Sequence, residues 1–128
     1  MLTREQALRV FRDVIVKECE KILISKGQNY SENNNTLSNF YESAADAEID
    51  VLKAWWVFTK KHLDAIKRVV RRKRVEDGES VEGRFYDAIN YMLLGFLILF
   101  IEHPEDLRKE TIDKVIKAIH TKKLNERR

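Results

Sequence analysis

The stretch from Glu79 to Glu102 constrains the fold more than any other part of the chain. It starts with charged and polar residues and ends in a nearly unbroken apolar run, Tyr91–Ile101. No proline interrupts it, so one helix is the simplest interpretation. A soluble helix that is apolar all round is buried on every side. We therefore predict an all-α protein, an antiparallel bundle of four main helices plus a short helix, with a central buried helix at about Glu79–Glu102.

Length and composition limit the class of protein. A chain of 128 residues with 44% hydrophobic residues is long enough for one domain, 1–128, with a real core. The single cysteine, Cys19, excludes an intramolecular disulfide and a cysteine-rich zinc site. The N-terminus lacks the pattern of a secretory signal, and the Tyr91–Ile101 run is shorter than the roughly 20 residues that cross a bilayer. We expect a cytoplasmic protein without a membrane partner.

Apolar residues at helical spacing predict the other helices. A first helix is expected over Thr3–Ser25, with Thr3 and Gln6 forming a capping box and Gly27 a left-handed C-terminal cap. The asparagine-rich segment Lys26–Asn39 is expected to be a loop, because asparagine favours turns. The remaining expected elements are a short helix around Phe40–Ala47, a long helix at Glu48–Arg74, a last helix from Pro104 to about Thr121, and a frayed basic tail, 121–128.

Carboxylates at the start of the central helix are candidate metal ligands. Glu79 and Glu82 are three residues apart and would share a helix face, a spacing that Asp87 and Asn90 repeat. Mg²⁺ takes oxygen ligands, usually one or two carboxylates together with phosphate oxygens and water. The alternative is structural, because Arg84 can pair with Asp87, and acids suit a helix N-terminus.

The long helix carries a second group of candidates. His62 lies on its apolar face, where a histidine is more often a hydrogen-bonded core residue than a catalytic one. Lys61 and Asp64 form a surface ion pair or face the acidic start of the central helix. Arg71, Arg72 and Arg74 belong to a basic run at the helix end, which is either a solvated helix end or a phosphate-binding patch.

Four motifs in order carry a family resemblance: KGQNY (26–30), NF (39–40), KHLDAI (61–66) and ESVEGRFYDAINY (79–91). Together they resemble the nucleotide modification associated domain family, small helical proteins of phage, viral or prokaryotic source. These proteins look related to the all-α nucleoside triphosphate pyrophosphatases of MazG type. The resemblance spans roughly Lys26 to Ile101. It implies a helical bundle that binds a nucleotide through Mg²⁺ and that forms a homodimer.

The resemblance also implies roles for individual residues. Nucleotide binding would fall to Lys26, Asn29, Tyr30, His62, Arg84, Asn90 and Tyr91. Glu79, Glu82 and Asp87 would hold Mg²⁺, and Lys61, Asp64 and Asp87 would have catalytic roles. The glutamate-rich EExxE motif of the MazG-type enzymes is missing here, since Glu42, Asp46, Glu48 and Asp50 have a different spacing.

Three functions follow from the sequence. The first is Mg²⁺-dependent nucleotide binding, with nucleoside triphosphate pyrophosphohydrolysis as the associated reaction. The second is a non-enzymatic helical dimer that binds nucleic acid through the basic end of the long helix, with Arg71, Arg72 and Arg74, and through the basic C-terminal tail. The third is a structural or partner-binding bundle.

Overall fold

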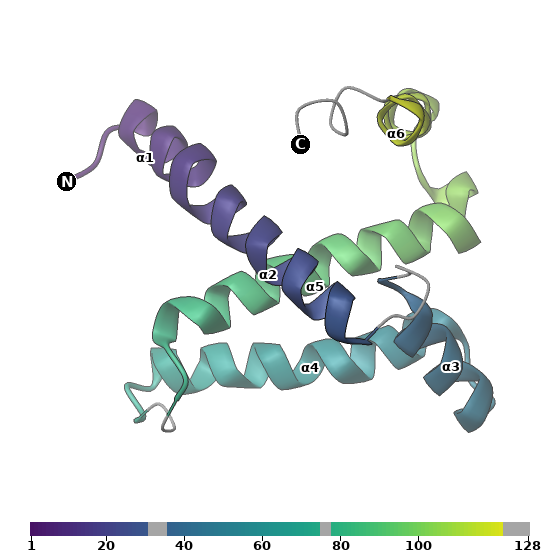
Figure 1. Cartoon of the computed structure of the whole chain (residues 1–128), viewed down its shortest axis with the longest axis horizontal. Helices are drawn as coiled ribbons and strands as arrows, with labels where there is room; N and C mark the ends of the chain where they lie inside the picture. The colour runs from purple at the N-terminus through teal and green to yellow at the C-terminus, as the bar shows by residue number, and fades with distance from the viewer. Residues whose placement is uncertain (31–35, 75–77, 122–128) are drawn as a thin grey trace.

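The described part of the chain is built from helices. A computed structural model describes residues 1–30, 36–74 and 78–121, except for the side chains of 27–30. Within these ranges every regular element is a helix and no strand occurs (Figure 1). This confirms the predicted all-α class with four main helices and a short one. The predicted frayed tail lies outside the described residues from position 122 onward.

The N-terminal helix is longer than predicted. Helices α1 (Arg4–Val10) and α2 (Val16–Tyr30) are joined without a break by a π-helical segment, η1 (Phe11–Ile15). The predicted capping box is present, since the Thr3 hydroxyl accepts from the Gln6 amide at 3.1 Å and the Gln6 side chain accepts from the Thr3 amide at 2.9 Å. The predicted end at Gly27 is wrong, and so is the loop assignment of Lys26–Tyr30. A glycine costs a helix only about 1 kcal/mol, which a long helix packed on another helix tolerates.

Helices α3 (Ser38–Ala47) and α4 (Val51–Val70) follow, and they meet at a sharp corner. Glu48 takes a left-handed conformation, φ 55°, and ends α3. Asp50 then caps α4 by accepting a hydrogen bond from the Leu52 amide at 2.9 Å. Helix α4 is shorter at both ends than the predicted Glu48–Arg74, because the corner takes its first residues and Arg72 leaves the helical region with φ 57°.

The core lies where α5 (Val81–Glu102) meets α3 and α4. Helices α4 and α5 run antiparallel and side by side, and α2 crosses α5 (Figure 1). Ser80 caps α5 by accepting from the Gly83 amide at 3.0 Å. The buried apolar side chains of this cluster are Leu37, Phe40, Ala44, Val51, Ala54, Leu94 and Ile98.

The expected burial of α5 on every side is wrong for this chain. Leu94 and Ile98 are buried, but Met92 is 44% exposed and Phe96 is 36% exposed. The reason is the position of the flanking helices. Helix α1 and the last helix, α6 (Lys109–His120), project away from α4 and bury none of their own residues (Figure 1). The short 3₁₀ turn η2 (Pro104–Asp106) separates α5 from α6 and has proline at its start. The predicted start of the last helix at Pro104 is wrong, because α6 begins at Lys109 after this turn.

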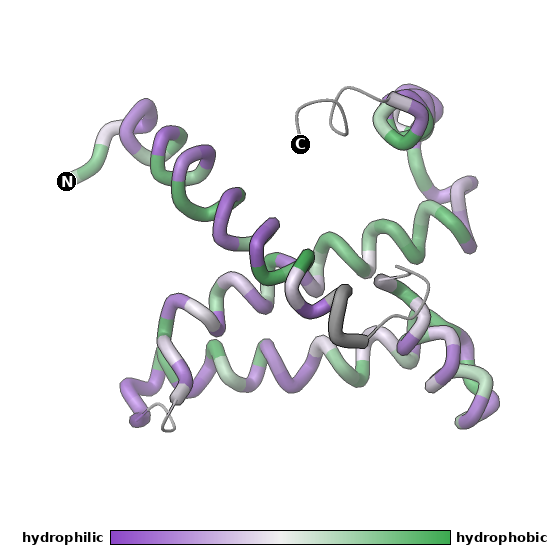
Figure 2. Tube along the Cα trace, in the orientation of Figure 1, coloured by the Kyte–Doolittle hydropathy of each residue, from purple (hydrophilic) through white to green (hydrophobic). Residues whose placement is uncertain are grey.

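Hydrophobic residues continue along α5 to its C-terminal end (Figure 2). Among the described helices, α5 is the one whose length and composition alone would permit it to cross a membrane, and 22% of its most apolar window is buried inside the protein. Its first half carries Arg84 and Asn90, both buried against other helices. The core helix of a soluble protein passes the same test of length and composition.

Candidate functional site

Three helices bring four of the predicted residues together. Lys26 comes from α2, His62 from α4, and Asp87 and Tyr91 from α5. The Lys26 ammonium lies 3.2 Å from the Asp87 carboxylate, and the two side chains are 52% and 28% exposed. This pair joins residues far apart in the sequence. Both partners keep solvent access, so a ligand can reach either charge.

His62 and Tyr91 form the aromatic side of the same site. Their ring centroids are 4.1 Å apart with 34° between the planes. Burial lowers the pKa of His62, and Asp87 opposes this shift while Lys26 adds to it. The histidine is therefore neutral at pH 7. Tyr91 also packs edge-on against Phe40 at 5.9 Å, which connects the site to the core.

Asn90 lies one turn from Asp87, but its side chain makes a structural contact between two helices. Its amide nitrogen donates to the Cys19 carbonyl oxygen at 3.0 Å in a buried position, which ties α5 to α2. The Cys19 thiol approaches the Tyr86 carbonyl oxygen at 3.8 Å, and burial raises its pKa. Cys19 is thus a small buried residue with little thiolate character.

Arg84 lies near the start of α5, and its side chain is buried. Its guanidinium donates to the Ala65 carbonyl oxygen at 3.2 Å and to the Glu79 carboxylate at 2.9 Å. The structure pairs it with Glu79, which differs from the expected pairing with Asp87. Its side chain is only 8% exposed. The position suits an anchor between α4 and α5 better than an open phosphate ligand.

The acidic candidates occupy different positions around the start of α5. Glu79 precedes the Ser80 cap, so it does not share a helix face with Glu82, and that premise of the sequence analysis is wrong. Glu82 is exposed in the first turn of α5. Within the described ranges no three His, Cys, Asp or Glu side chains gather in a metal-binding group. Asp87 is the candidate carboxylate that pairs with Lys26 and that acts on the pKa of His62.

Lys61 and Asp64 each contact another residue of α4. The Lys61 ammonium is 5.8 Å from the centre of the Phe58 ring and contributes to the low pKa of His62. Asp64 is 54% exposed and lies 3.9 Å from Lys67, one helical turn away. Asp64 therefore has a surface ion pair with a partner different from the one expected.

Two further candidates lie outside the described side chains. Asn29 and Tyr30 belong to the last turn of α2, but only their backbone is described. Because α2 continues through this segment, the predicted nucleotide-binding loop is helical at Lys26. Its remainder at 31–35 is outside the described residues.

Sequence reasoning missed the role of Trp55 in supporting the site. The Trp55 indole donates to the Tyr91 carbonyl oxygen at 2.8 Å, and its ring lies against Gly95. This contact holds α5 at the turn that carries Tyr91. The signal available in the sequence was the tryptophan on α4 together with a glycine within an apolar helix.

The basic candidates occupy the opposite end of α4 from α3. Arg71, Arg72 and Arg74 are all exposed just beyond the end of the helix. Arg72 also lines a recess with Val69, Lys73 and Val81. This end is open to solvent and lies on a different part of α4 from His62.

Comparisons of the chain with protein-family models, with curated proteins and with solved structures give no match.

Proposed function

We propose that the protein binds a nucleotide together with Mg²⁺ at the site formed by Lys26, His62, Asp87 and Tyr91. The observation that carries the proposal is the Lys26–Asp87 pair, 3.2 Å apart and partly exposed, beside the stacked rings of His62 and Tyr91. A cation, a carboxylate and an aromatic surface are the three kinds of group that meet a phosphate, a metal ion and a base.

Each group has a chemical role in this proposal. Asp87 would supply one carboxylate to Mg²⁺, which usually takes its other oxygen ligands from phosphates and water. Lys26, which is paired with Asp87 here, would bind a phosphate oxygen of the nucleotide. A direct role of Glu79 and Glu82 in metal binding stays a prediction, and the pairing of Glu79 with Arg84 makes Asp87 the stronger candidate.

The reaction proposed for this site is hydrolysis of a nucleoside triphosphate to a monophosphate and pyrophosphate. A Mg²⁺ ion held by Asp87 and the phosphates would neutralise phosphate charge and would favour loss of a proton from water. In the hydrolysis, a water oxygen bonds to the α-phosphorus, the bond from that phosphorus to the bridging oxygen breaks, and pyrophosphate leaves. His62 is neutral at pH 7 and can accept the water proton, since its pKa is lowered. Lys61, close to His62, can neutralise charge on the leaving group.

Thermal unfolding with each common NTP and dNTP, with and without Mg²⁺, tests the binding proposal. A ligand present at 100 times its dissociation constant adds about 2.7 kcal/mol to the free energy of unfolding. We expect a Mg²⁺-dependent rise in melting temperature for a subset of nucleotides. No rise with any nucleotide would contradict the proposal.

Asp87→Asn should abolish the nucleotide-dependent rise, and Lys26→Met should weaken it. Asp113→Asn is the matched control, because Asp113 is an exposed acid on α6 that undergoes the same change of charge. Pyrophosphate release, measured on the nucleotides that bind, tests the reaction. Hydrolysis that survives in Asp87→Asn would show that this site is not the one that acts.

Nucleic-acid binding is the second candidate, and the exposed basic end of α4 favours it. Replacing Arg71, Arg72 and Arg74 together with glutamine should weaken binding to DNA. The slope of log affinity against log salt concentration should become shallower by about 0.9 for each DNA phosphate that the variant no longer neutralises. The control replaces Lys109, Lys114 and Lys117, three exposed lysines of α6. An equal weakening in both triple variants would argue against this patch.

A further inference from the structure

Helix α6 is strongly amphipathic, and none of its 12 residues is buried within the described part of the chain. Its larger apolar residues recur at intervals of three, one and three positions, so they share one face of the helix. This stripe consists of Ile112, Val115, Ile116 and Ile119. The side chains of Ile116 and Ile119 are 43% and 61% exposed. The apolar face of α6 is therefore open to solvent.

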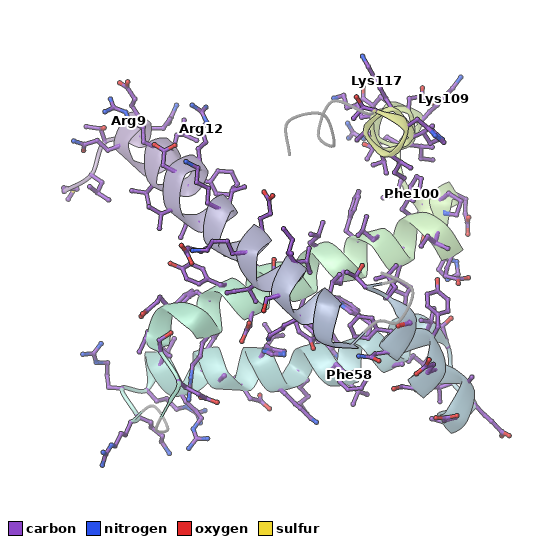
Figure 3. The ribbon with its side chains drawn as sticks, viewed as in Figure 1. Arg9, Arg12, Phe58, Phe100, Lys109 and Lys117 are labelled. Atoms are coloured by element: carbon purple, nitrogen blue, oxygen red, sulfur yellow. The ribbon has the colours of Figure 1, made fainter. Side chains whose placement is uncertain are left out.

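The other side of α6 carries lysines. Lys114 follows Ile112 by two residues and Lys117 precedes Ile119 by two, and residues two apart on a helix point about 200° apart. Both lysines are exposed. Lys109 and Lys117 point away from Phe100 at the end of α5 (Figure 3). The helix thus has an apolar face and a basic face.

The positive charge of the protein is concentrated around this helix. Residues 108–128 contain eight lysines or arginines and three acids, a net charge of +5, whereas the whole chain carries +3. The 107 residues before them therefore carry −2 in total. A basic segment that includes an amphipathic helix has the composition of proteins that attach to the surface of anionic membranes.

We propose that α6 binds the surface of a membrane that contains anionic phospholipids, with its axis parallel to the bilayer. Ile116 and Ile119 enter the boundary between headgroups and acyl chains, and the lysines stay among the headgroup phosphates. Charge and apolar surface together select this partner. Nucleic acid would match the lysines but would leave the isoleucines in water, whereas an uncharged protein surface would cover the isoleucines and make no use of the charge.

The position of α6 in the fold suits this arrangement. It makes only minor contacts with the other described helices and follows the short turn η2, so it can lie on a membrane while the core stays in water. Isolated helices shorter than about 12–15 residues are marginal in water, and a membrane surface would support α6. The expectation of no membrane partner rested on the absence of a spanning segment, and a helix that lies in the interface needs none.

Helix α5 is not the membrane contact in this proposal, although its length and composition alone would permit a span. Arg84 and Asn90 bond to residues of α4 and α2, which keeps α5 within the fold. A span would bring a charge and an amide to the depth of the hydrocarbon. Neither Lys26 nor Asp87 contributes to the α6 surface, so the proposal stands independently of the nucleotide site.

Co-sedimentation of the full chain with vesicles tests the proposal. The vesicles are phosphatidylcholine alone, or phosphatidylcholine with about one third phosphatidylserine. We expect binding to the mixed vesicles, about 10-fold or more tighter than to phosphatidylcholine alone, and weaker as salt is added. No binding to the mixed vesicles, or equal binding to both kinds, would overturn the proposal.

Variants on the two faces of α6 locate the contact. Ile116→Glu combined with Ile119→Glu should lower vesicle affinity about 10-fold or more. The matched control is Val57→Glu combined with Val70→Glu on α4, since these valines are 59% and 74% exposed, and it should bind as the wild type does. Binding that survives the isoleucine variant would show that α6 does not enter the membrane.

Neutralising the basic face tests the electrostatic part. Lys114→Gln combined with Lys117→Gln should lower affinity for the mixed vesicles about fivefold for each lysine. The control neutralises Lys53 and Lys60, two exposed lysines of α4, and should have a much smaller effect. Equal losses in the two variants would mean that charge anywhere on the protein suffices, which contradicts the proposal.

A fluorescence experiment keeps the test valid if the glutamate variants do not fold. In a Cys19→Ala background, a polarity-sensitive dye attached at Ile116→Cys should shift to the blue on mixed vesicles, and the same dye at Lys114→Cys should not. Equal shifts at both positions would overturn the proposal. So would a blue shift at position 116 that grows with protein concentration in the absence of vesicles, or binding to duplex DNA through Lys114 and Lys117 without binding to vesicles.

Discussion

At the scale of single residues, Arg84 shows how a charge can be buried in a small helical protein. It donates to the Ala65 carbonyl oxygen and to Glu79, and its Nε has no hydrogen-bond partner within the described part of the chain. Arg84→Ala should lower the free energy of unfolding by about 2–4 kcal/mol, because the contacts of the guanidinium with Ala65 and Glu79 are lost and a cavity remains. Urea denaturation measures the change.

Arg9→Ala is the control for this prediction, because Arg9 has an exposed ion pair with Glu5. Exposed pairs contribute about 0–1 kcal/mol. Glu79→Gln should lower the free energy of unfolding by less than Arg84→Ala and by more than Arg9→Ala. Glu79 is 54% exposed, and Arg84 keeps its bond to Ala65 in this variant. Equal losses of stability in Arg84→Ala and Arg9→Ala would show that burial of the guanidinium does not matter.

His62 should make stability depend on pH below neutrality. Burial holds its pKa below the ordinary value, so the unfolded chain takes up a proton at this position before the folded chain does. The free energy of unfolding is therefore unaffected by His62 above pH about 6.5, falls as the pH drops below that value, and levels off below the folded pKa.

Urea denaturation at pH 7, 6 and 5 tests this dependence. Wild-type protein should lose more stability between pH 7 and 5 than His62→Gln does. His120→Gln, at the exposed end of α6, is the control and should keep the wild-type slope. A variant of His62 with an unchanged slope would mean that other groups govern the pH dependence.

At the scale of helices, the contact between Trp55 and Gly95 sets how closely α4 approaches α5. A Cβ at position 95 would overlap ring atoms of Trp55. Gly95→Ala should therefore lower the free energy of unfolding by about 1–3 kcal/mol, although alanine favours a helix over glycine by about 1 kcal/mol. Thermal and urea unfolding measure the decrease.

A double variant identifies the cause of that decrease. Trp55→Leu removes the indole, so adding Gly95→Ala in that background should cost much less than in the wild type. The difference between the two backgrounds is the coupling between the positions. If Gly95→Ala has the same effect in both, the approach of the helices is not limited by the indole.

At the scale of the whole molecule, dimer formation should appear in thermal unfolding. The melting temperature of a dimer rises with protein concentration, because dissociation accompanies unfolding. We expect such a rise for the wild type over a hundredfold range of concentration, and a smaller rise for Phe96→Glu. A melting temperature independent of concentration would contradict the expected homodimer.

Much of the fold could be predicted because helices depend on local pattern. The capping box of Thr3 and Gln6 and the break at Pro104 are set by residues within a few positions of each other, and both are present. The helix at 81–102 followed from an apolar run without proline. The end of α2 was misjudged, since a glycine ends a helix only when nothing else supports the next turn.

The sequence indicated which residues belong to the candidate site but not which partners they contact. Lys26, His62, Asp87 and Tyr91 were named, and the structure brings them together. Spacing along the chain could not show that Asn90 bonds to Cys19 or that Arg84 bonds to Glu79. Those partners come from other helices or from beyond the Ser80 cap.

The sequence by itself determined which segments form helices and which face of each helix is apolar, because both depend on side chains a few residues apart. Only the tertiary structure decided which apolar faces are covered. An apolar run such as Tyr91–Ile101 looks the same whether its neighbours come from its own chain or from elsewhere. Its burial depends on where α1 and α6 lie, and here they leave Met92 and Phe96 exposed.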